Sequence, residues 1–273
     1  MNSKPDIISG SQGTPIAIVT GAASGLGFAF AKLLAADGHP LLMIDKNEAG
    51  LAEASTYIQK NFGTEAEILC LNLSSPESPA EIMQLIGNRD IGVLINNAGF
   101  GLYGPFSATS WEPEAEMIHL HVLNLTRLTK LVLQNMLRRK AGKIMNVSSL
   151  AALQPGPLFS VYSASKAYIR SFSLALAAEL RGSGITVTVL CPGQTHTNFA
   201  REVSRKSGSA LSKVPMTANA EEVAVYGYKA MLGGKPLAIP GFTNKCVAAL
   251  TALLPNFFTA RINMKIQQKI RNQ

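Results

Sequence analysis

A glycine-rich turn directly after an apolar run is the feature that most restricts how this chain folds. The run Ile16–Val19 precedes the segment TGAASGLG at positions 20–27, and an amphipathic stretch follows. A strand, a glycine turn and a helix in this order form the cradle that holds a dinucleotide pyrophosphate on helix N–H groups. Gly21 permits the tight turn, Gly25 lets phosphate approach the backbone, and Gly27 lets the helix pack on the sheet. This order predicts a dinucleotide-binding α/β fold.

Apolar, β-branched runs alternate with helical patterns along the rest of the chain. The alternation predicts one α/β domain, a Rossmann-like doubly wound parallel sheet of about seven strands with helices on both faces. The expected strands are Ile16–Thr20, Leu41–Asp45, Glu67–Leu71, Val93–Asn96, Gly142–Val147, Ile185–Leu190 and Leu237–Ile239. The expected helices are Leu26–Asp37, Ala49–Phe62, Pro79–Gly87, Trp111–Arg139, Tyr162–Arg181 and Ala220–Leu232.

Tyr162 and Lys166 are four residues apart, so on a helix their side chains share one face. A lysine ammonium beside a phenol favours the phenolate, which predicts a lowered pKa for Tyr162 and a role as general acid/base near neutral pH. With the cradle, the pair indicates hydride transfer between a nicotinamide cofactor and an alcohol or carbonyl. His119, His121 and His196 lack a recognisable partner, so the predicted mechanism omits them, and His196 is kept as a minor substrate contact.

The second expected strand ends in Asp45, 18 residues after Gly27. A carboxylate at this position accepts hydrogen bonds from the adenosine ribose hydroxyls and repels a 2′-phosphate. The adjacent Lys46 would attract the same phosphate. NAD(H) is therefore the favoured cofactor, and NADP(H) stays open.

The glycine spacing GxxxGxG begins a resemblance to the short-chain dehydrogenase/reductase family that runs from about Thr14 to Ile239. Further motifs of that family follow in order. They are the segment NNAG at positions 96–99, the YxxxK pair, and Pro192-Gly193 followed by Thr197. The resemblance implies that the NNAG segment steadies the sheet and borders the adenosine side, and that Thr197 faces the nicotinamide carboxamide.

The resemblance implies four catalytic residues, Asn124, Ser149, Tyr162 and Lys166. Ser149 precedes Tyr162 by 13 residues and would stabilise negative charge on the substrate oxygen, with the adjacent Ser148 as its rival. Lys166 would lower the pKa of Tyr162 and bind the nicotinamide ribose. Asn124 would hold a water that links Lys166 to solvent as a proton relay.

The expected cofactor-binding residues combine the cradle, the acidic strand end and the family motifs. They are Gly21, Ser24, Gly25, Leu26, Gly27, Asp45, Asn72, Leu73, Asn97, Ala98, Gly99, Tyr162, Lys166, Pro192, Gly193, Thr195 and Thr197. Asn72 stands where many relatives carry an aspartate near adenine, and its amide still donates and accepts hydrogen bonds. No metal site is expected, because Cys70, Cys191 and Cys246 lack ligand spacing and are interpreted as reduced, mostly buried thiols.

The segments that are expected to line the substrate site are mostly apolar. Leu150–Phe159, Gly99–Phe106 and the loop after Gly193 supply Phe and Leu side chains, with no evident arginine clamp for a carboxylate or phosphate. A lipophilic alcohol or ketone, such as a steroid-like, fatty or aromatic compound, is the predicted substrate. The family resemblance also implies a homodimer or homotetramer built partly on the two long helices, Trp111–Arg139 and Tyr162–Arg181.

The chain divides into three parts. Residues 1–13 are polar and lack the apolar core of a signal peptide, so a flexible N-terminal leader is expected. Residues 14–240 form the Rossmann-type catalytic domain, in which about 194–217 are interpreted as a substrate loop. Residues 241–273 form a basic amphipathic C-terminal extension. No run reaches the ~18 apolar residues of a spanning helix, and a soluble, cytoplasmic protein is expected.

The C-terminal extension carries most of the net charge of +8. Glu222 is the last acidic residue, and the apolar residues Phe258, Ile262, Ile266 and Ile270 recur every four positions beside a basic stripe. This pattern predicts an amphipathic helix that packs on its own subunit or a symmetry mate, with peripheral contact to an anionic membrane as the alternative. Nucleic-acid binding is not expected, since no reader motif or aromatic platform accompanies the charge.

The sequence as a whole predicts an NAD(P)(H)-dependent oxidoreductase that interconverts an alcohol and a carbonyl. One alternative is a non-catalytic dinucleotide sensor or scaffold, which would be expected to have lost the acid/base pair. Another is a lyase or epimerase on the same fold, which would use bound NAD without net consumption.

Overall fold

The computed structural model describes residues 14–196, 199, 203 and 218–271. The expected leader, residues 1–13, lies outside this range, as does most of the expected substrate loop, about 194–217.

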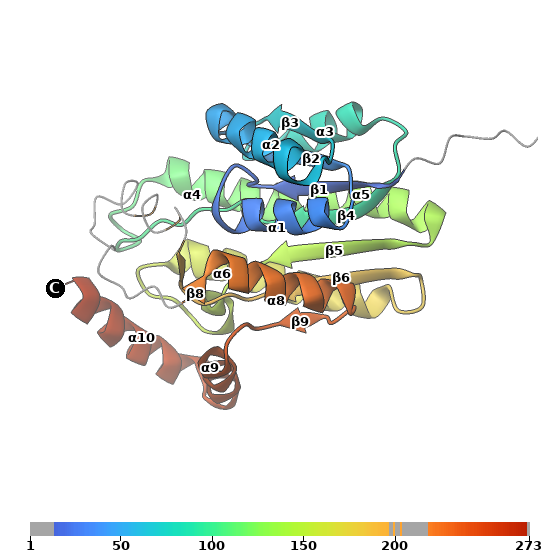
Figure 1. Ribbon diagram of the computed structural model, residues 1–273. Coiled ribbons are helices and arrows are strands. Elements are labelled where there is room, and N and C mark those ends of the chain that lie inside the picture. Colours follow the sequence, from blue (N-terminus) through green and yellow to red (C-terminus); the bar gives the residue numbers. More distant parts are fainter. Residues whose placement is uncertain (1–13, 197–198, 200–202, 204–217, 272–273) are drawn as a thin grey trace, which may run out of the picture.

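Seven strands form one sheet in the order β3-β2-β1-β4-β5-β6-β9, and all its pairings are parallel (Figure 1). The strands are β1 (Ile16–Thr20), β2 (Leu41–Asp45), β3 (Ala66–Cys70), β4 (Ile91–Asn96), β5 (Gly142–Val147), β6 (Ile185–Leu190) and β9 (Leu237–Ala238). The chain moves outward from β1 to β3 and then returns to β4 on the other side of β1. The predicted doubly wound fold is confirmed, and its switch point lies where β1 and β4 end, the usual ligand crevice of such sheets.

Helices cover both faces of the sheet. On one face lie α1 (Gly25–Ala36), α2 (Glu48–Phe62) and α8 (Ala220–Leu232), and on the other α3 (Ser78–Ile86), α5 (Leu125–Arg139) and α6 (Ser160–Glu179). Alternate residues of β1 enter the two cores, Ala17 and Val19 on the first face and Ile16 and Ile18 on the second. A strand buried on both faces is apolar throughout, which is why β1 is visible as an uninterrupted run.

The helix predicted over Trp111–Arg139 is not one regular helix. It consists of α4 (Trp111–Ile118), a π-helical turn η1 (His119–Asn124) and α5. A π turn closes i to i+5 hydrogen bonds and changes which residues face a neighbour, and such turns are frequent at functional sites. This turn decides which side chain of the helix reaches the catalytic residues.

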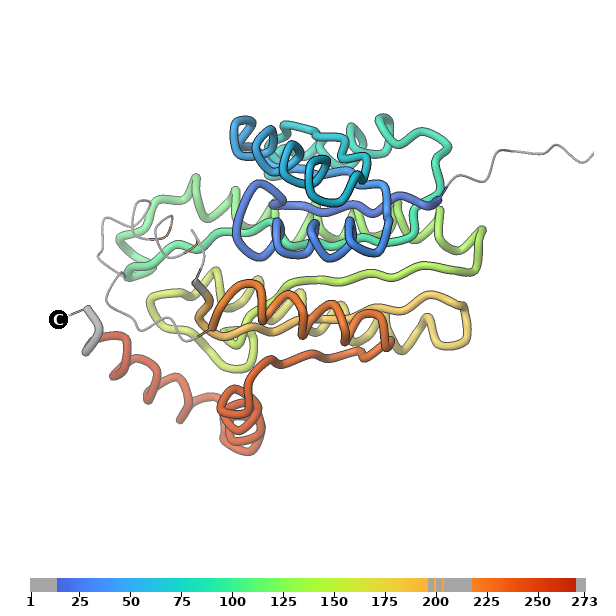
Figure 2. Tube along the Cα trace, in the orientation of Figure 1, coloured from blue at the N-terminus to red at the C-terminus, as the bar shows by residue number. Residues whose placement is uncertain are grey.

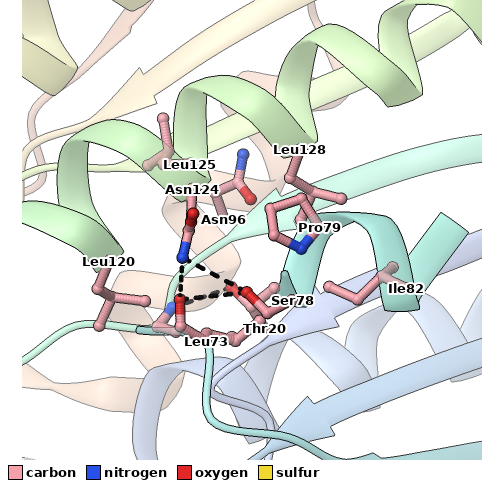
Figure 3. A pocket seen from close by; sticks show the side chains of 11 residues that line it. Thr20, Leu73, Ser78, Pro79, Ile82, Asn96, Leu120, Asn124, Leu125 and Leu128 are labelled. Atoms are coloured by element: carbon pink, nitrogen blue, oxygen red, sulfur yellow. Dashed lines mark hydrogen bonds between the residues drawn. The ribbon is translucent and has the colours of Figure 1, made fainter. Parts of the chain in front are cut away.

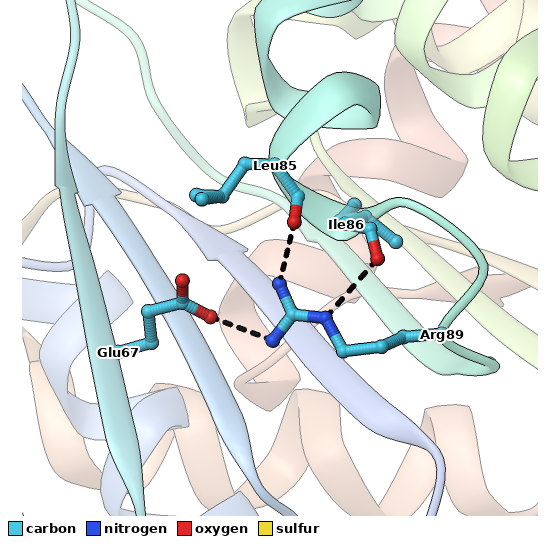
Figure 4. A network of polar contacts seen from close by, with 4 residues as sticks. All are labelled: Glu67, Leu85, Ile86 and Arg89. Carbon is cyan, nitrogen blue, oxygen red and sulfur yellow. Dashed lines mark hydrogen bonds and ion pairs between the residues drawn. The ribbon is translucent and has the colours of Figure 1, made fainter.

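An arginine ties the sheet edge to the next helix (Figure 4). Arg89 donates to Glu67 of β3 at 2.7 Å, to the Leu85 oxygen at 2.9 Å and to the Ile86 oxygen at 3.1 Å. The Arg89 and Glu67 side chains are partly exposed, so the ion pair adds at most about 1 kcal/mol. The contacts with the two carbonyls end α3 and position the start of β4.

Short elements and two C-terminal helices complete the described fold. A 3₁₀ turn η2 (Leu150–Leu153) follows β5, and the pair β7 (Thr195–His196) and β8 (Ala218–Asn219) stands apart from the main sheet. The helices α9 (Phe242–Leu253) and α10 (Asn256–Arg271) extend beyond β9, away from the sheet (Figure 2). In the part of the chain that the structure describes, no helix is both long and apolar enough to cross a bilayer.

The cysteine prediction is only partly correct. Cys191 is buried, whereas Cys70 and Cys246 are exposed, and all three are free thiols. Cys70 lies on the edge strand β3, which has one open side, and Cys246 lies on α9, which has no buried residue.

Candidate active site

The glycine turn after β1 is packed too closely to accept side chains. Gly21 and Gly25 have positive φ angles of 67° and 55°. A Cβ atom at Gly27 would lie 2.0 Å from the Gly21 carbonyl oxygen. Ser24, the exposed N-cap of α1, makes no side-chain capping hydrogen bond, and the helix begins at Gly25 and Leu26. The first N–H groups of α1 therefore fit a pyrophosphate, as the sequence predicts.

Asn97 fastens the cradle to the end of β4. Its Nδ2 donates to the backbone oxygens of Thr20 and Gly21 at 3.0 and 3.2 Å. The Thr20 hydroxyl in turn accepts the N–H groups of Asn97 and Ala98 at 2.9 and 3.0 Å. The predicted residues Asn97, Ala98 and Gly99 thus line the switch point of the sheet.

The adenosine side is built by the loops after β2 and β3. The Asp45 carboxylate accepts the N–H groups of Ala23 and Asn47, both at 3.1 Å. Each carboxylate oxygen accepts more than one hydrogen bond, so Asp45 retains capacity for ribose hydroxyls. Asn72 is exposed, and its Oδ1 accepts the Ser74 N–H at 3.0 Å.

Three of the four predicted catalytic residues come together at the ends of β5 and α6. The Ser149 hydroxyl hydrogen-bonds the Tyr162 phenol. Lys166 Nζ lies 5.8 Å from the centre of the Tyr162 ring and donates to the Val147 oxygen at 3.0 Å. The rival Ser148 instead donates to the Lys166 backbone oxygen at 2.7 Å. Its hydroxyl fixes the helix, which leaves Ser149 as the serine that faces the phenol.

The prediction that the pKa of Tyr162 is lowered is wrong for the protein chain alone. Burial of the hydroxyl raises the pKa of Tyr162 to about 12, and the hydrogen bond with Ser149 opposes this rise only in part. Burial also lowers the pKa of Lys166 to about 8, against a smaller opposite effect of Cys191. The loss of water around both groups outweighs the expected attraction between ammonium and phenolate. Tyr162 is therefore a protonated phenol at neutral pH.

Asn124, the fourth predicted catalytic residue, has a different position (Figure 3). Its Nδ2 donates to the backbone oxygens of Leu73 and Ser75 at 2.8 and 2.7 Å, with Ser78 Oγ at 3.5 Å. An amide nitrogen carries two hydrogens, so both are used by the loop after β3. Asn124 and Leu73 border a small cavity of about 20 Å³ with Asn96. The relay role expected for Asn124 is therefore corrected to a structural one, in which it holds the β3–α3 loop.

His121 occupies the place beside Lys166 that the sequence analysis gave to Asn124. A methyl group added at Gly99 would lie 2.8 Å from His121 Nε2 and 3.3 Å from Lys166 Nζ, so both nitrogens border the same space. The His121 ring also lies 6.1 Å from the Tyr162 ring, edge to face. His121 was not among the residues of the predicted mechanism. The sequence did contain a signal for His121. It precedes Asn124 by three residues on one predicted helix, and side chains at i and i+3 of a helix lie close together.

The segment after β6 carries the remaining predicted cofactor residues. The Pro192 oxygen accepts the Leu150 N–H at 2.9 Å, and the Thr195 hydroxyl donates to the Gly193 oxygen at 3.1 Å. A Cβ at Gly193 would lie 2.9 Å from Asn244 Nδ2 of α9. Thr197 lies outside the described residues, so its predicted contact with the nicotinamide is not placed.

Apolar side chains gather around the phenol. Tyr103, Leu158 and Val203 form a buried cluster, against which Phe159, Phe199 and Met264 pack. The Tyr162 ring lies 5.9 Å from the Phe159 ring and 5.5 Å from the Phe199 ring. The predicted apolar lining is thus assembled from the segment after β4, the segment after β5, residues 199 and 203, and α10.

Comparison with known proteins identifies the family. Residues 15–208 match the short chain dehydrogenase family. The chain is 34% identical over 193 residues to 17-beta-hydroxysteroid dehydrogenase type 3 of Mus musculus, an alignment that covers 70% of this chain and 63% of the mouse protein. It is 28% identical over 260 residues to the very-long-chain 3-oxoacyl-CoA reductase of Bos taurus, covering 93% and 80% of the two chains.

Solved structures agree with these matches. The fold resembles that of a short-chain dehydrogenase from Sphingobium yanoikuyae in complex with NADPH, with a TM-score of 0.78 and 26% sequence identity. The similarity covers 88% of this chain and 96% of that one. The glycine turn and the serine–tyrosine–lysine group lie within residues 15–208, and the chain belongs to the short-chain dehydrogenase family.

Proposed function

We propose that this protein is an NAD(P)(H)-dependent oxidoreductase that interconverts an alcohol and a carbonyl on a lipophilic substrate. The observation that carries the proposal is the Tyr162 phenol, which is hydrogen-bonded to Ser149, lies above the buried Lys166 and is surrounded by apolar rings. A bound nicotinamide dinucleotide would supply or accept the hydride. The cradle at Gly21–Gly27, Asp45 and Lys166 would hold it.

The residues of this site handle the proton that accompanies the hydride. In the direction of reduction, the neutral Tyr162 phenol donates its proton to the oxygen of the new alcohol. In the direction of oxidation, the phenolate accepts that proton. The Ser149 hydroxyl donates to the substrate oxygen and stabilises negative charge there. The Lys166 ammonium, 4% exposed, places a positive charge below the phenol and stabilises its deprotonated form during turnover.

A lipophilic substrate is supported by two kinds of observation. The described lining around Tyr162 consists of Tyr, Phe, Leu, Val and Met side chains. The curated relatives are, by name, a 17-beta-hydroxysteroid dehydrogenase and a very-long-chain 3-oxoacyl-CoA reductase. The first name specifies a hydroxysteroid, and the second specifies a very-long-chain 3-oxoacyl group carried on CoA. We propose a steroid-like, fatty or aromatic substrate for this chain, and a homodimer or homotetramer as its assembly.

The choice between NAD(H) and NADP(H) is testable at Asp45. We expect wild-type protein to bind NADH more tightly than NADPH, because the carboxylate accepts ribose hydroxyls and repels a 2′-phosphate. Replacement Asp45→Ser removes the charge, and we expect the ratio of NADH to NADPH affinity to fall by at least about tenfold. Fluorescence titration with both cofactors measures the ratio. Glu48→Ser, which removes an exposed charge nearby at the start of α2, serves as the control and leaves the ratio unchanged.

Two other activities remain distinguishable from this one. A dinucleotide sensor would bind cofactor without turning over any alcohol or ketone. A lyase or epimerase would convert substrate without a lasting change in cofactor absorbance. The intact Ser149, Tyr162 and Lys166 group favours net hydride transfer over a sensor, and the cofactor absorbance during turnover separates it from a lyase or epimerase.

The C-terminal helices support a second proposal, peripheral contact with an anionic membrane. The own-subunit packing expected for the apolar stripe of α10 is wrong: Phe258, Ile262 and Ile266 are 56%, 52% and 50% exposed. The opposite side of α10 faces the body, where Asn263 donates to the Pro155 oxygen at 2.9 Å. No side chain of α9 is buried.

Charge favours a lipid surface over a second copy of the chain. Lys245, Arg261 and Lys265 flank the exposed apolar side chains, and no acidic residue follows Glu222. A two-fold contact would bring one basic stripe against its own copy, whereas an anionic bilayer offers the opposite charge. Because Met264 of α10 also packs on the apolar cluster, contact through α10 would bring the substrate site close to the bilayer.

Vesicle flotation tests the membrane proposal. We expect wild-type protein to float with vesicles that contain phosphatidylserine and to stay unbound with phosphatidylcholine alone, with binding that weakens as salt rises. The double variant Arg261→Glu with Lys265→Glu should lose this binding. Lys130→Glu, an exposed charge on α5, should keep it. No flotation at low salt, or equal loss in the Lys130 variant, contradicts the proposal, and light scattering then tests a second copy as the partner.

A further inference from the structure

His121 is a buried histidine whose hydrogen bonds fix its tautomer. It is 1% exposed, and its Nδ1 lies 2.9 Å from Ser165 Oγ. The Ser165 hydroxyl donates to the Tyr162 backbone oxygen at 2.8 Å, so it accepts from His121, and Nδ1 carries the hydrogen. The Phe100 N–H donates to Nε2 at 3.3 Å, which agrees with this assignment. The lone pair of the imidazole is therefore on Nε2.

That lone pair borders the position of the Lys166 ammonium. His121 Nε2 and Lys166 Nζ both lie next to Gly99, where an added methyl group would touch each of them. Burial and the neighbouring Lys166 charge hold the pKa of His121 well below its usual range. The imidazole is thus neutral, and its Nε2 lone pair, which accepts the Phe100 N–H at the long distance of 3.3 Å, is an acceptor that a neighbouring ammonium would share.

No competing side chain takes this place among the described residues around Lys166. The titratable groups that face Lys166 are His121 from η1, Tyr162 from its own helix and Cys191 after β6. Asn124 uses both of its amide hydrogens on the β3–α3 loop. One N–H of the Lys166 ammonium is bonded to the Val147 oxygen, which leaves two for other acceptors.

We propose that His121 is a positioning residue that orients the Lys166 ammonium beside Tyr162, its Nε2 lone pair being shared between the Phe100 N–H and the ammonium. It is not a proton wire, because the chain from Nδ1 through Ser165 ends at a backbone carbonyl. The inference deepens the proposed function and rests on it for its effect on turnover. Its effect on Lys166 can be measured without any cofactor or substrate.

Two substitutions separate the acceptor from the bulk of the ring. In His121→Gln, an amide oxygen takes approximately the place of Nε2, whereas His121→Leu keeps an apolar volume without an acceptor. We expect the Leu variant to lower kcat by about 10- to 100-fold with the KM for the ketone little changed, because a misplaced catalytic group slows chemistry more than substrate binding. We expect the Gln variant to recover most of this loss. Equal losses in both variants contradict a role for the acceptor.

NMR titration of the Lys166 side chain in the cofactor-free protein provides the second readout. A hydrogen bond to the ammonium favours the charged form, so its loss in His121→Leu should shift the Lys166 titration down by about one pH unit. His121→Gln should titrate like wild type, and Asn124→Ala should leave Lys166 unchanged. An unchanged titration in His121→Leu, or a shift in Asn124→Ala alone, overturns the proposal. If no substrate is turned over, the proposed function fails while this measurement still decides the role of His121.

Discussion

Replacement of Tyr162 by Phe is expected to reduce kcat by at least about 100-fold, the range of a lost general acid/base. The substitution removes the hydroxyl that donates the proton to the substrate oxygen. The ring itself remains, with its neighbours Phe159, Phe199 and His121 at 5.9, 5.5 and 6.1 Å. The variant should therefore fold and bind dinucleotide like wild type. Steady-state kinetics with a lipophilic ketone and fluorescence titration with NADH measure the two effects.

Tyr168→Phe serves as the matched control for this loss. Tyr168 lies on the same helix α6, and its hydroxyl makes a solvent-exposed hydrogen bond with the Thr126 hydroxyl at 2.9 Å. This variant should keep wild-type turnover. Unchanged turnover in Tyr162→Phe would remove Tyr162 from the mechanism. A sensor or scaffold would show no turnover in either protein.

Replacement of Gly27 by Ala is expected to disrupt the cradle. The new methyl group would lie 2.0 Å from the Gly21 carbonyl oxygen and 2.6 Å from Asn97 Nδ2. The first of these is backbone, so α1 must move away from the turn. Overpacking of this kind lowers the free energy of unfolding by about 1–3 kcal/mol, and here it also separates the N–H groups that hold the pyrophosphate. We expect a lower melting temperature and loss of measurable NADH binding.

Gly233→Ala controls for the general effect of adding a methyl group. Gly233 ends α8 with a φ angle of −78°, and the nearest atom to its added Cβ is 3.4 Å away. This variant should match wild type in melting temperature and in NADH affinity. A Gly27→Ala protein with wild-type stability and binding would show that the close approach of α1 to the turn is not required.

The strands were predictable because a strand that is buried on both faces of the sheet is an uninterrupted apolar run in the sequence. The runs that contain β1, β2, β5 and β6 were predicted with the bounds that the structure has. The start of β4 was placed two residues late, because Gly92 interrupts its apolar run. Helix α9 was missed, because no side chain of α9 is buried and its apolar residues follow no core-facing period.

The catalytic group was only partly predictable for a related reason. Ser149 follows β5, and Tyr162 and Lys166 lie on α6, so their local geometry follows from sequence spacing. The choice between Asn124 and His121 depends on the π turn, which has no local sequence pattern. The π turn is fixed by contacts with distant segments: His121 contacts Ser165 on α6, and Asn124 contacts the loop after β3. The pKa of Tyr162 likewise depends on burial, which spacing does not reveal.

Transfer of deuterium tests the central claim most directly. The purified protein is incubated with a panel of lipophilic ketones and with NADH or NADPH that carries deuterium at the transferable position, and products are analysed by mass spectrometry. We predict an alcohol with deuterium on its carbinol carbon, formed by wild-type protein and not by Tyr162→Phe. Bound cofactor with no label transferred to any ketone would contradict it, as would product formed without cofactor oxidation.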